Sequence, residues 1–199
     1  MLKIIKNQYK ELDAFKMTAV ISNEINIEWG DLFSRLKSKS TKTIVFIDPV
    51  VHSLHIDKFN QIVEINDLVQ VIPTKINEST KGLESLVSVL ERFENLSVGR
   101  RDDFIYAVGG GALLDLVSLA ANLYRRGVSV IKVPTTLLAC VDASIGIKTG
   151  INFMNRRNRL GSYYLNYSVL LETQLLISLD KNLIREGLGE IFKIAVIKS

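Results

Sequence analysis

The chain has 199 residues, of which 47% are hydrophobic and 23% charged, values that suit one globular domain or one domain and the start of a second. A single cysteine, Cys140, and two histidines exclude a disulfide framework and a cysteine-rich zinc module. No apolar run approaches the ~18 residues of a membrane span, and the first residues lack the apolar core of a secretory signal. We therefore expect a cytoplasmic protein with no membrane contact.

The net charge of +4 is concentrated in one stretch of the chain. Between residues 125 and 159 there are seven lysines or arginines and one acid, Asp142. Such a local excess favours a small anionic ligand such as a phosphate, although a solvated basic face would have the same composition. No helix-turn-helix or zinc pattern is present, so nucleic acid is not an expected partner.

Strand and helix signals alternate through the middle of the chain, after an N-terminal part in which residues 2–5 and 17–21 suggest strands and 29–36 a short helix. β-branched and apolar runs predict strands, and apolar residues at helical spacing predict helices between them. The predicted strands are 43–48, 68–73, 104–108 and 128–133, and the predicted helices are 81–96, 112–126 and a last one from residue 181 onward. This order predicts an α/β fold with a mostly parallel sheet and helices on its faces.

Three consecutive glycines, Gly109, Gly110 and Gly111, stand between a predicted buried strand and a predicted buried helix. Glycine lets a ligand approach the backbone closely, and the N–H groups at a helix N-terminus favour phosphate. In parallel α/β sheets, nucleotides bind at this position. A tight turn without a ligand is the alternative, since the strict G-x-G-x-x-G spacing is absent.

Charged residues at the ends of other predicted elements are further candidates. Asp48 follows its strand at the same carboxyl edge of the sheet, where it would accept hydrogen bonds from a ribose. Asp115 is expected in the first turn of the helix after the glycines, either to bind a ribose or amide group or only to complement the helix dipole. Glu78 and Lys81 flank the start of the preceding helix, where such charges are commonly structural.

The segment from 134 to 152 disperses polar residues among small and apolar ones. Burial of Lys148 in such surroundings is costly without a partner, and either Asp142 or a ligand phosphate would serve. The loop expected at 155–161 is cationic and would grip phosphate. On the last helix, Glu190 and Lys193 lie three residues apart, as a surface ion pair or as a cleft pair suited to a metal ion and an anionic substrate.

Six motifs occur together in this chain: GGGALLD (109–115), YRRG (124–127), VPTTL (133–137), DASIGIKTGIN (142–152), NRLG (158–161) and GLGEIFK (187–193). Their order and spacing resemble those of the sugar phosphate cyclases, the superfamily of 3-dehydroquinate synthase. The resemblance implies a Rossmann-like NAD-binding domain over residues 1–178. It also implies that residues 179–199 are the first helix of an all-helical metal and substrate domain.

Within that family, Gly146-Ile147 before Lys148 and the run NRLGSY at 158–163 resemble the branch of 2-epi-5-epi-valiolone synthases, which cyclise sedoheptulose 7-phosphate. The first alternative is 3-dehydroquinate synthase, which acts on 3-deoxy-D-arabino-heptulosonate 7-phosphate. The second is a non-catalytic NAD-binding remnant. Iron- or zinc-dependent alcohol dehydrogenase activity belongs to more distant relatives.

The resemblance also implies a role for each candidate residue. The NAD ligands would be Asp48, Glu78, Lys81, Gly109, Gly110, Gly111, Asp115, Thr135, Thr136, Arg157 and Ser178, with Arg157 in place of the family's usual lysine. Substrate hydroxyls and phosphate would be bound by the catalytic residues Asp142, Lys148, Asn158 and Lys193, and by Arg126 lent across a homodimer interface.

Glu190 would be the first of three ligands to zinc or cobalt. The other two in the family are histidines of the helical domain, so the 199 residues alone are expected to be inactive. The implied reaction oxidises a substrate hydroxyl with NAD, eliminates phosphate, returns the hydride and closes a carbocycle by an internal aldol step.

Overall fold

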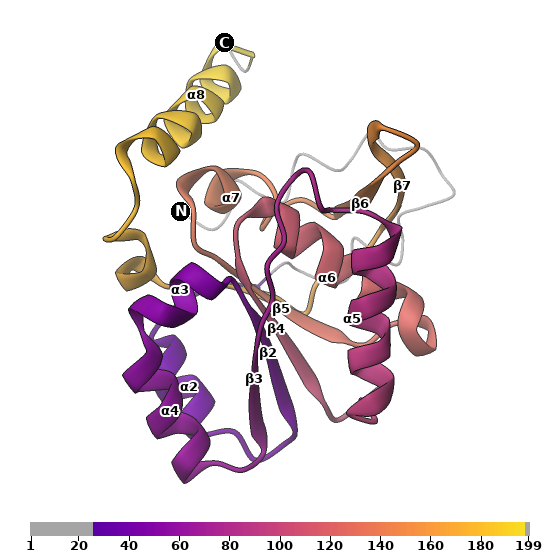
Figure 1. The fold of residues 1–199 in the computed structure, drawn as a ribbon. Coiled ribbons are helices and arrows are strands. Elements are labelled where there is room, and N and C mark those ends of the chain that lie inside the picture. The colour runs from indigo at the N-terminus through magenta and orange to yellow at the C-terminus, as the bar shows by residue number, and fades with distance from the viewer. Residues whose placement is uncertain (1–25, 198–199) are drawn as a thin grey trace.

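Six parallel strands form the central sheet of the computed structural model, which describes residues 26–197 (Figure 1). The strands are β1 (Asn26–Trp29), β2 (Thr43–Ile47), β3 (Val69–Pro73), β4 (Phe104–Gly109), β5 (Ser129–Pro134) and β8 (Ser168–Leu171). Their order across the sheet is β1-β8-β5-β4-β2-β3, and every neighbouring pair is parallel. The four predicted strands are confirmed to within one residue at each end, and so is the α/β class.

Helices cover both faces of this sheet. On one face lie α5 (Leu83–Asn95) and α6 (Gly111–Leu123), and on the other lie α2 (Leu32–Lys37) and α4 (Ile56–Ile65). Alternate residues of a strand point to opposite faces, so in β2 Phe46 packs with α5 while Val45 and Ile47 pack with α2 and α4. All five β2 side chains are buried. This two-sided burial is the reason that the central strands are continuous apolar runs.

Within residues 26–197, the remaining helices are α3 (Pro49–Leu54), α7 (Leu137–Val141) and α8 (Lys181–Ile197), with 3-10 turns at Tyr124–Arg126 and Thr173–Leu176. The prediction for 112–126 was wrong at its end: α6 stops at Leu123, and Arg125 has a left-handed φ of 49°. The prediction for 29–36 was wrong at its start, because Trp29 belongs to β1 and the Asp31 carboxylate caps α2 by accepting from the Phe33 N–H. The strands suggested at 2–5 and 17–21 lie outside the described residues.

An antiparallel hairpin, β6 (Lys148–Phe153) and β7 (Arg156–Tyr163), lies outside the central sheet and contacts α6. The loop predicted at 155–161 was therefore wrong, since most of these residues form β7. Gly161 is required in this ladder, because a Cβ there would overlap the carbonyl oxygen of Thr149. The hairpin carries Lys148 and Asn158 to the side of α6 that bears Asp115.

Helix α8 packs on α7 and extends away from the sheet (Figure 1). Gly187 is its buried residue, and apolar side chains such as Leu188 and Phe192 are exposed. Within residues 26–197, no helix combines the length and the apolar character needed to cross a membrane.

Candidate functional site

Three of the predicted site segments meet at the carboxyl edge of the sheet. The Asp48 N–H donates to the Val108 carbonyl at 2.9 Å, and the Thr135 N–H donates to the Gly109 carbonyl at 3.0 Å. The ends of β2, β4 and β5 therefore lie side by side. The chain passes from β2 outward to β3, then returns to β4 on the other side of β2. In doubly wound sheets, ligands bind at such a reversal.

The glycine turn after β4 begins α6, with Gly110 at the N-cap. Gly110 has a φ of −76°, which any residue adopts, and a Cβ there would meet the Thr136 methyl group at an ordinary 3.6 Å. A Cβ at Gly111 would meet that of Ala143 at 3.4 Å. The fold thus does not require glycine at these two positions, which argues against the interpretation of a tight turn alone.

Asp48 and Thr136 both cap short helices. The Asp48 carboxylate accepts from the Val50 N–H at 2.8 Å and opens α3, and the Thr136 hydroxyl accepts from the Ala139 N–H at 3.1 Å and opens α7. These contacts give each side chain a structural role at the place predicted for NAD.

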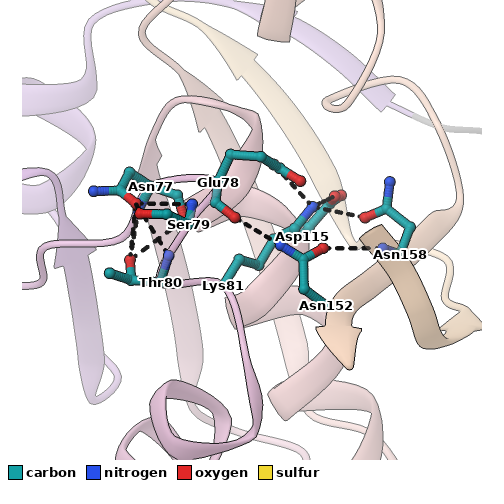
Figure 2. A network of polar contacts seen from close by, with 8 residues as sticks. All are labelled: Asn77, Glu78, Ser79, Thr80, Lys81, Asp115, Asn152 and Asn158. Carbon is teal, nitrogen blue, oxygen red and sulfur yellow. Dashed lines mark hydrogen bonds and ion pairs between the residues drawn. The ribbon is translucent and has the colours of Figure 1, made fainter. Parts of the chain in front are cut away.

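Lys81 is the centre of a polar network between three elements (Figure 2). Its side chain is 3% exposed, and its ammonium lies 3.0 Å from Asp115 Oδ2, 2.8 Å from Asn158 Oδ1 and 3.4 Å from Glu78 Oε2. A buried ammonium needs such partners, because desolvation without them costs several kcal/mol. Lys81 is therefore not the ordinary charge at a helix start that its position in the sequence indicated.

Asn152 ties the segment before α5 to the hairpin. Its amide nitrogen donates to the Glu78 carbonyl at 2.6 Å, and its Oδ1 accepts from the Asn158 N–H at 3.0 Å. The Asn152 N–H donates to the Lys81 carbonyl at 2.7 Å. In the sequence Asn152 is only one of the polar residues of the 134–152 segment, and two of its partners, Glu78 and Lys81, lie more than 70 positions away.

Asp115 lies in the second turn of α6, so its predicted place in the first turn was wrong. Helix α6 starts at Gly111, which makes Asp115 its fifth residue. Burial raises the pKa of the Asp115 carboxyl, while the Lys81 ammonium beside it acts in the opposite direction. The cost of burying this negative charge is therefore offset by the ion pair with Lys81 rather than by the helix dipole.

An open cavity of about 520 Å³ lies beside this network. Asp115, Asp142, Lys148 and Asn158 all line it, together with Arg159 and small residues of the hairpin. Lys148 and Asp142 are both exposed and form no ion pair with each other within residues 26–197. The expected burial of Lys148 was therefore wrong, as was the purely structural Asp142–Lys148 pair.

Lys132 is a buried cation that sequence reasoning missed. It lies on β5 with a side chain that is 0% exposed, and its ammonium donates to the carbonyls of Ala143 at 2.7 Å and Gly146 at 3.2 Å. Burial lowers the pKa of Lys132 to about 8, against the opposing effect of Asp115 and Asp142. The sequence feature that could have indicated its burial is a single lysine inside an otherwise apolar strand. This lysine was counted only as one of the seven basic residues between 125 and 159.

Three other predicted residues lie on the surface. Arg126 has a left-handed φ of 66° and lies beyond the C-terminal end of α6, a helix length away from the glycine turn in the same chain. Arg157 is exposed on β7, and Ser178 is exposed in the connection to α8. The structure does not bring these three side chains to the cavity.

Glu190 and Lys193 form an ion pair at 2.6 Å on α8, as their spacing allows. The Glu190 side chain is 17% exposed and that of Lys193 is 59% exposed. The part of the chain that the structure describes contains no group of three histidine, cysteine, aspartate or glutamate side chains able to hold a metal ion. Glu190 alone therefore does not make a metal site.

Comparisons with known proteins agree on one family. Residues 71–186 match the family model described as 3-dehydroquinate synthase N-terminal. The chain is 43% identical over 128 residues to a 2-epi-5-epi-valiolone synthase of Streptomyces albus, covering 64% of this chain and 31% of that protein. It is 34% identical over 183 residues to a 3-dehydroquinate synthase of Clostridium kluyveri, covering 89% of this chain and 51% of that protein.

One solved structure with a similar fold is ValA, a 2-epi-5-epi-valiolone synthase from Streptomyces hygroscopicus subsp. jinggangensis 5008 with NAD⁺ and Zn²⁺ bound. It superposes with a TM-score of 0.77 at 30% identity, over 90% of this chain and 51% of that one. The chain spans about half, or less, of the length of the proteins that it matches.

Proposed function

Because the chain belongs to the 3-dehydroquinate synthase N-terminal family, we propose that it forms the NAD-binding part of a sugar phosphate cyclase. The observation that carries this proposal is the cavity beside the glycine turn, where Asp115, Asp142, Lys148 and Asn158 converge from different parts of the chain. Polar and charged side chains that converge on one concave site are typical of small-molecule sites.

NAD fits the carboxyl edge of the sheet. The bare backbone at Gly110 and Gly111 leaves space at the N-terminus of α6, where N–H groups favour a pyrophosphate. Asp48, Thr135 and Thr136 lie at the adjoining strand ends and would surround the remainder of the cofactor. When bound, NAD would supply transient hydride acceptance and return.

The cavity suits a phosphorylated polyol. The exposed ammonium of Lys148 and the nearby Arg159 provide positive charge for a phosphate group, which also stabilises it as a leaving group. Asp142 and Asn158 provide acceptors and a donor for hydroxyl groups. The Asn158 carbonyl oxygen is already bound to Lys81, so its amide N–H groups are the ones that can turn to a ligand.

For the substrate, we favour sedoheptulose 7-phosphate and its conversion to 2-epi-5-epi-valiolone. Support comes from the Streptomyces albus relative and from ValA, and from Gly146-Ile147 before Lys148. The similarity to a 3-dehydroquinate synthase keeps that activity as the second candidate. A non-catalytic NAD-binding remnant is the third candidate, because Glu190 belongs to no group of three metal-ligating side chains within residues 26–197.

Titration calorimetry with NAD⁺ tests the proposed cofactor site in the 199-residue chain. Gly110→Ala should fold with an unchanged melting temperature and bind NAD⁺ at least about tenfold more weakly, because its methyl group would occupy the cradle. Gly189→Ala on α8, where a Cβ would have open space, is the matched control. Equal affinity in the wild-type chain and Gly110→Ala, or no binding by the folded wild-type chain, would contradict the proposal.

The substrate is tested by phosphate release in the presence of NAD⁺ and Zn²⁺, with a full-length family member whose N-terminal half is replaced by this chain. Turnover of sedoheptulose 7-phosphate is expected. Turnover of only 3-deoxy-D-arabino-heptulosonate 7-phosphate would favour the second candidate. Tight NAD⁺ binding with turnover of neither would favour the non-catalytic remnant.

A further inference from the structure

Lys132 is an unusual residue for a central strand. Its neighbours across the sheet are Ala107 on β4 and Val169 on β8, and its side chain is among the largest that are fully buried. The small Ala107 side chain leaves room for it. A charge in this position contributes little to stability compared with an apolar residue of similar shape, so its presence calls for another reason.

The partners of Lys132 are backbone carbonyls in the turn between α7 and β6. Within this turn, the N–H groups of Ile145 and Gly146 donate to the Asp142 carbonyl at 3.1 and 2.9 Å. The carbonyls of Ala143 and Gly146 instead accept from the Lys132 ammonium. Two N–H donors of the turn are thus satisfied within it, while two of its carbonyl acceptors depend on the Lys132 side chain from the sheet.

This turn forms one wall of the cavity. Asp142, Ala143 and Gly146 line the cavity, and Lys148 follows directly at the start of β6. We infer that Lys132 is a positioning residue. By donating to the Ala143 and Gly146 carbonyls, it fixes the turn that presents Asp142 and Lys148 to the cavity. That the ligand there is a phosphorylated substrate rests on the function proposed above.

Lys132 also contributes charge to the cavity floor. Two buried cations, Lys81 and Lys132, act on the same carboxylate, Asp115, which lines the cavity. Lys81 contacts that carboxylate directly, whereas Lys132 reaches it through space. Both buried cations offset the negative charge of Asp115 and so reduce its repulsion of an anion that binds in the open cavity.

Hydrogen exchange of the backbone amides of residues 143–147 tests this inference without any ligand. Lys132→Met removes the donors and keeps a similar shape, whereas Lys132→Gln keeps two N–H donors. We expect exchange of the Ile145 and Gly146 amides to become at least about tenfold faster in Lys132→Met, given the usual strength of hydrogen bonds from charged donors. Lys132→Gln should restore most of the protection, and β4 should be unaffected in both.

Unchanged protection of the turn in folded Lys132→Met would overturn the inference. If that variant does not fold, Lys132→Gln decides: a protected turn supports the inference, and an exposed turn contradicts it. Failure of both variants to fold would also contradict it, because Lys132 would then serve the core as a whole.

Titration with inorganic phosphate gives a second readout on the same variants. Affinity should fall about tenfold in Lys132→Met and recover in part in Lys132→Gln, which restores the hydrogen bonds but not the charge. If the wild-type chain binds no phosphate, the proposed ligand is wrong, while the exchange experiment still decides the role of Lys132.

Discussion

Replacing Gly187 by alanine tests how α8 is held against the domain. A Cβ at this position would lie 2.5 Å from Cγ and 2.6 Å from Cβ of Leu137, and 2.8 Å from the backbone nitrogen of Leu138. A rotamer change cannot relieve the contact with the backbone, so α7 and α8 must separate. Overpacking of this kind costs about 1–3 kcal/mol.

Gly189, two residues further along the same helix, supplies the matched control. It is exposed, and a Cβ there would have nothing within 4 Å. Both substitutions gain about 1 kcal/mol of helix propensity, so the difference between the two variants isolates the clash. At about 1.4 kcal/mol per factor of ten, the clash corresponds to a roughly 5- to 150-fold larger population of detached α8.

Hydrogen exchange in α7 and limited proteolysis of the connection before α8 measure that population. In Gly187→Ala we expect faster exchange of the α7 amides and faster cleavage near Ile177, which is 84% exposed. Gly189→Ala should show exchange and cleavage no faster than in the wild-type chain, and β4 should be unchanged in both. Equal exchange and cleavage in the two variants would refute docking through Gly187. The same contact positions Glu190, which lies one turn beyond Gly187 on the same helix face.

Three further predictions concern the charged groups. Lys148→Met should change the free energy of unfolding by no more than about 0.5 kcal/mol, because Lys148 is exposed, yet weaken phosphate binding severalfold; urea denaturation and titration check this. Lys81→Met should destabilise the chain by about 3 kcal/mol by leaving Asp115 unpaired, and adding Asp115→Asn should recover part of that loss in the same denaturation assay. Burial lowers the pKa of Lys132 to about 8 from an ordinary 10.5, so across that pH window the unfolded chain binds more protons than the folded one. The free energy of unfolding of the wild-type chain should therefore rise with pH by up to about 1.4 kcal/mol per unit relative to Lys132→Met, and a falling difference would contradict the buried cation.

The strands that are buried on both faces were predictable, because their apolar runs depend only on local sequence. Helices α3 and α4 were not predicted: Pro49–Leu54 is too short for a helical period, and His55 interrupts the pattern between the two. Residues 155–161 were predicted as a loop because β7 is exposed along nearly its whole length and carries arginines rather than alternating apolar residues.

The site was predicted as a set of residues but not as a set of contacts. Asp48 and the three glycines could be placed at one sheet edge from topology alone. The bonds of Lys81 to Asp115 and Asn158 span 34 and 77 positions, so no local pattern reports them. For the same reason the sequence did not show that Lys132 is buried and that Lys148 is exposed: neighbouring residues in sequence do not show which side of a strand or hairpin faces the core.

The residues at the carboxyl edge of the sheet are better explained by ligand binding than by stability. Lys81, Lys132 and Asp115 place charge in or near the core, where apolar side chains would usually be neutral or more stabilising. Gly110 leaves the backbone bare at a point where the fold would accept a side chain. The buried charges and the bare glycine backbone belong to separate elements: the segment before α5, the β4–α6 turn and β5. They nevertheless lie beside the same cavity. Departures from the most stable sequence are expected at functional sites, and their coincidence here supports the proposal that this edge of the sheet and the adjoining cavity bind a ligand.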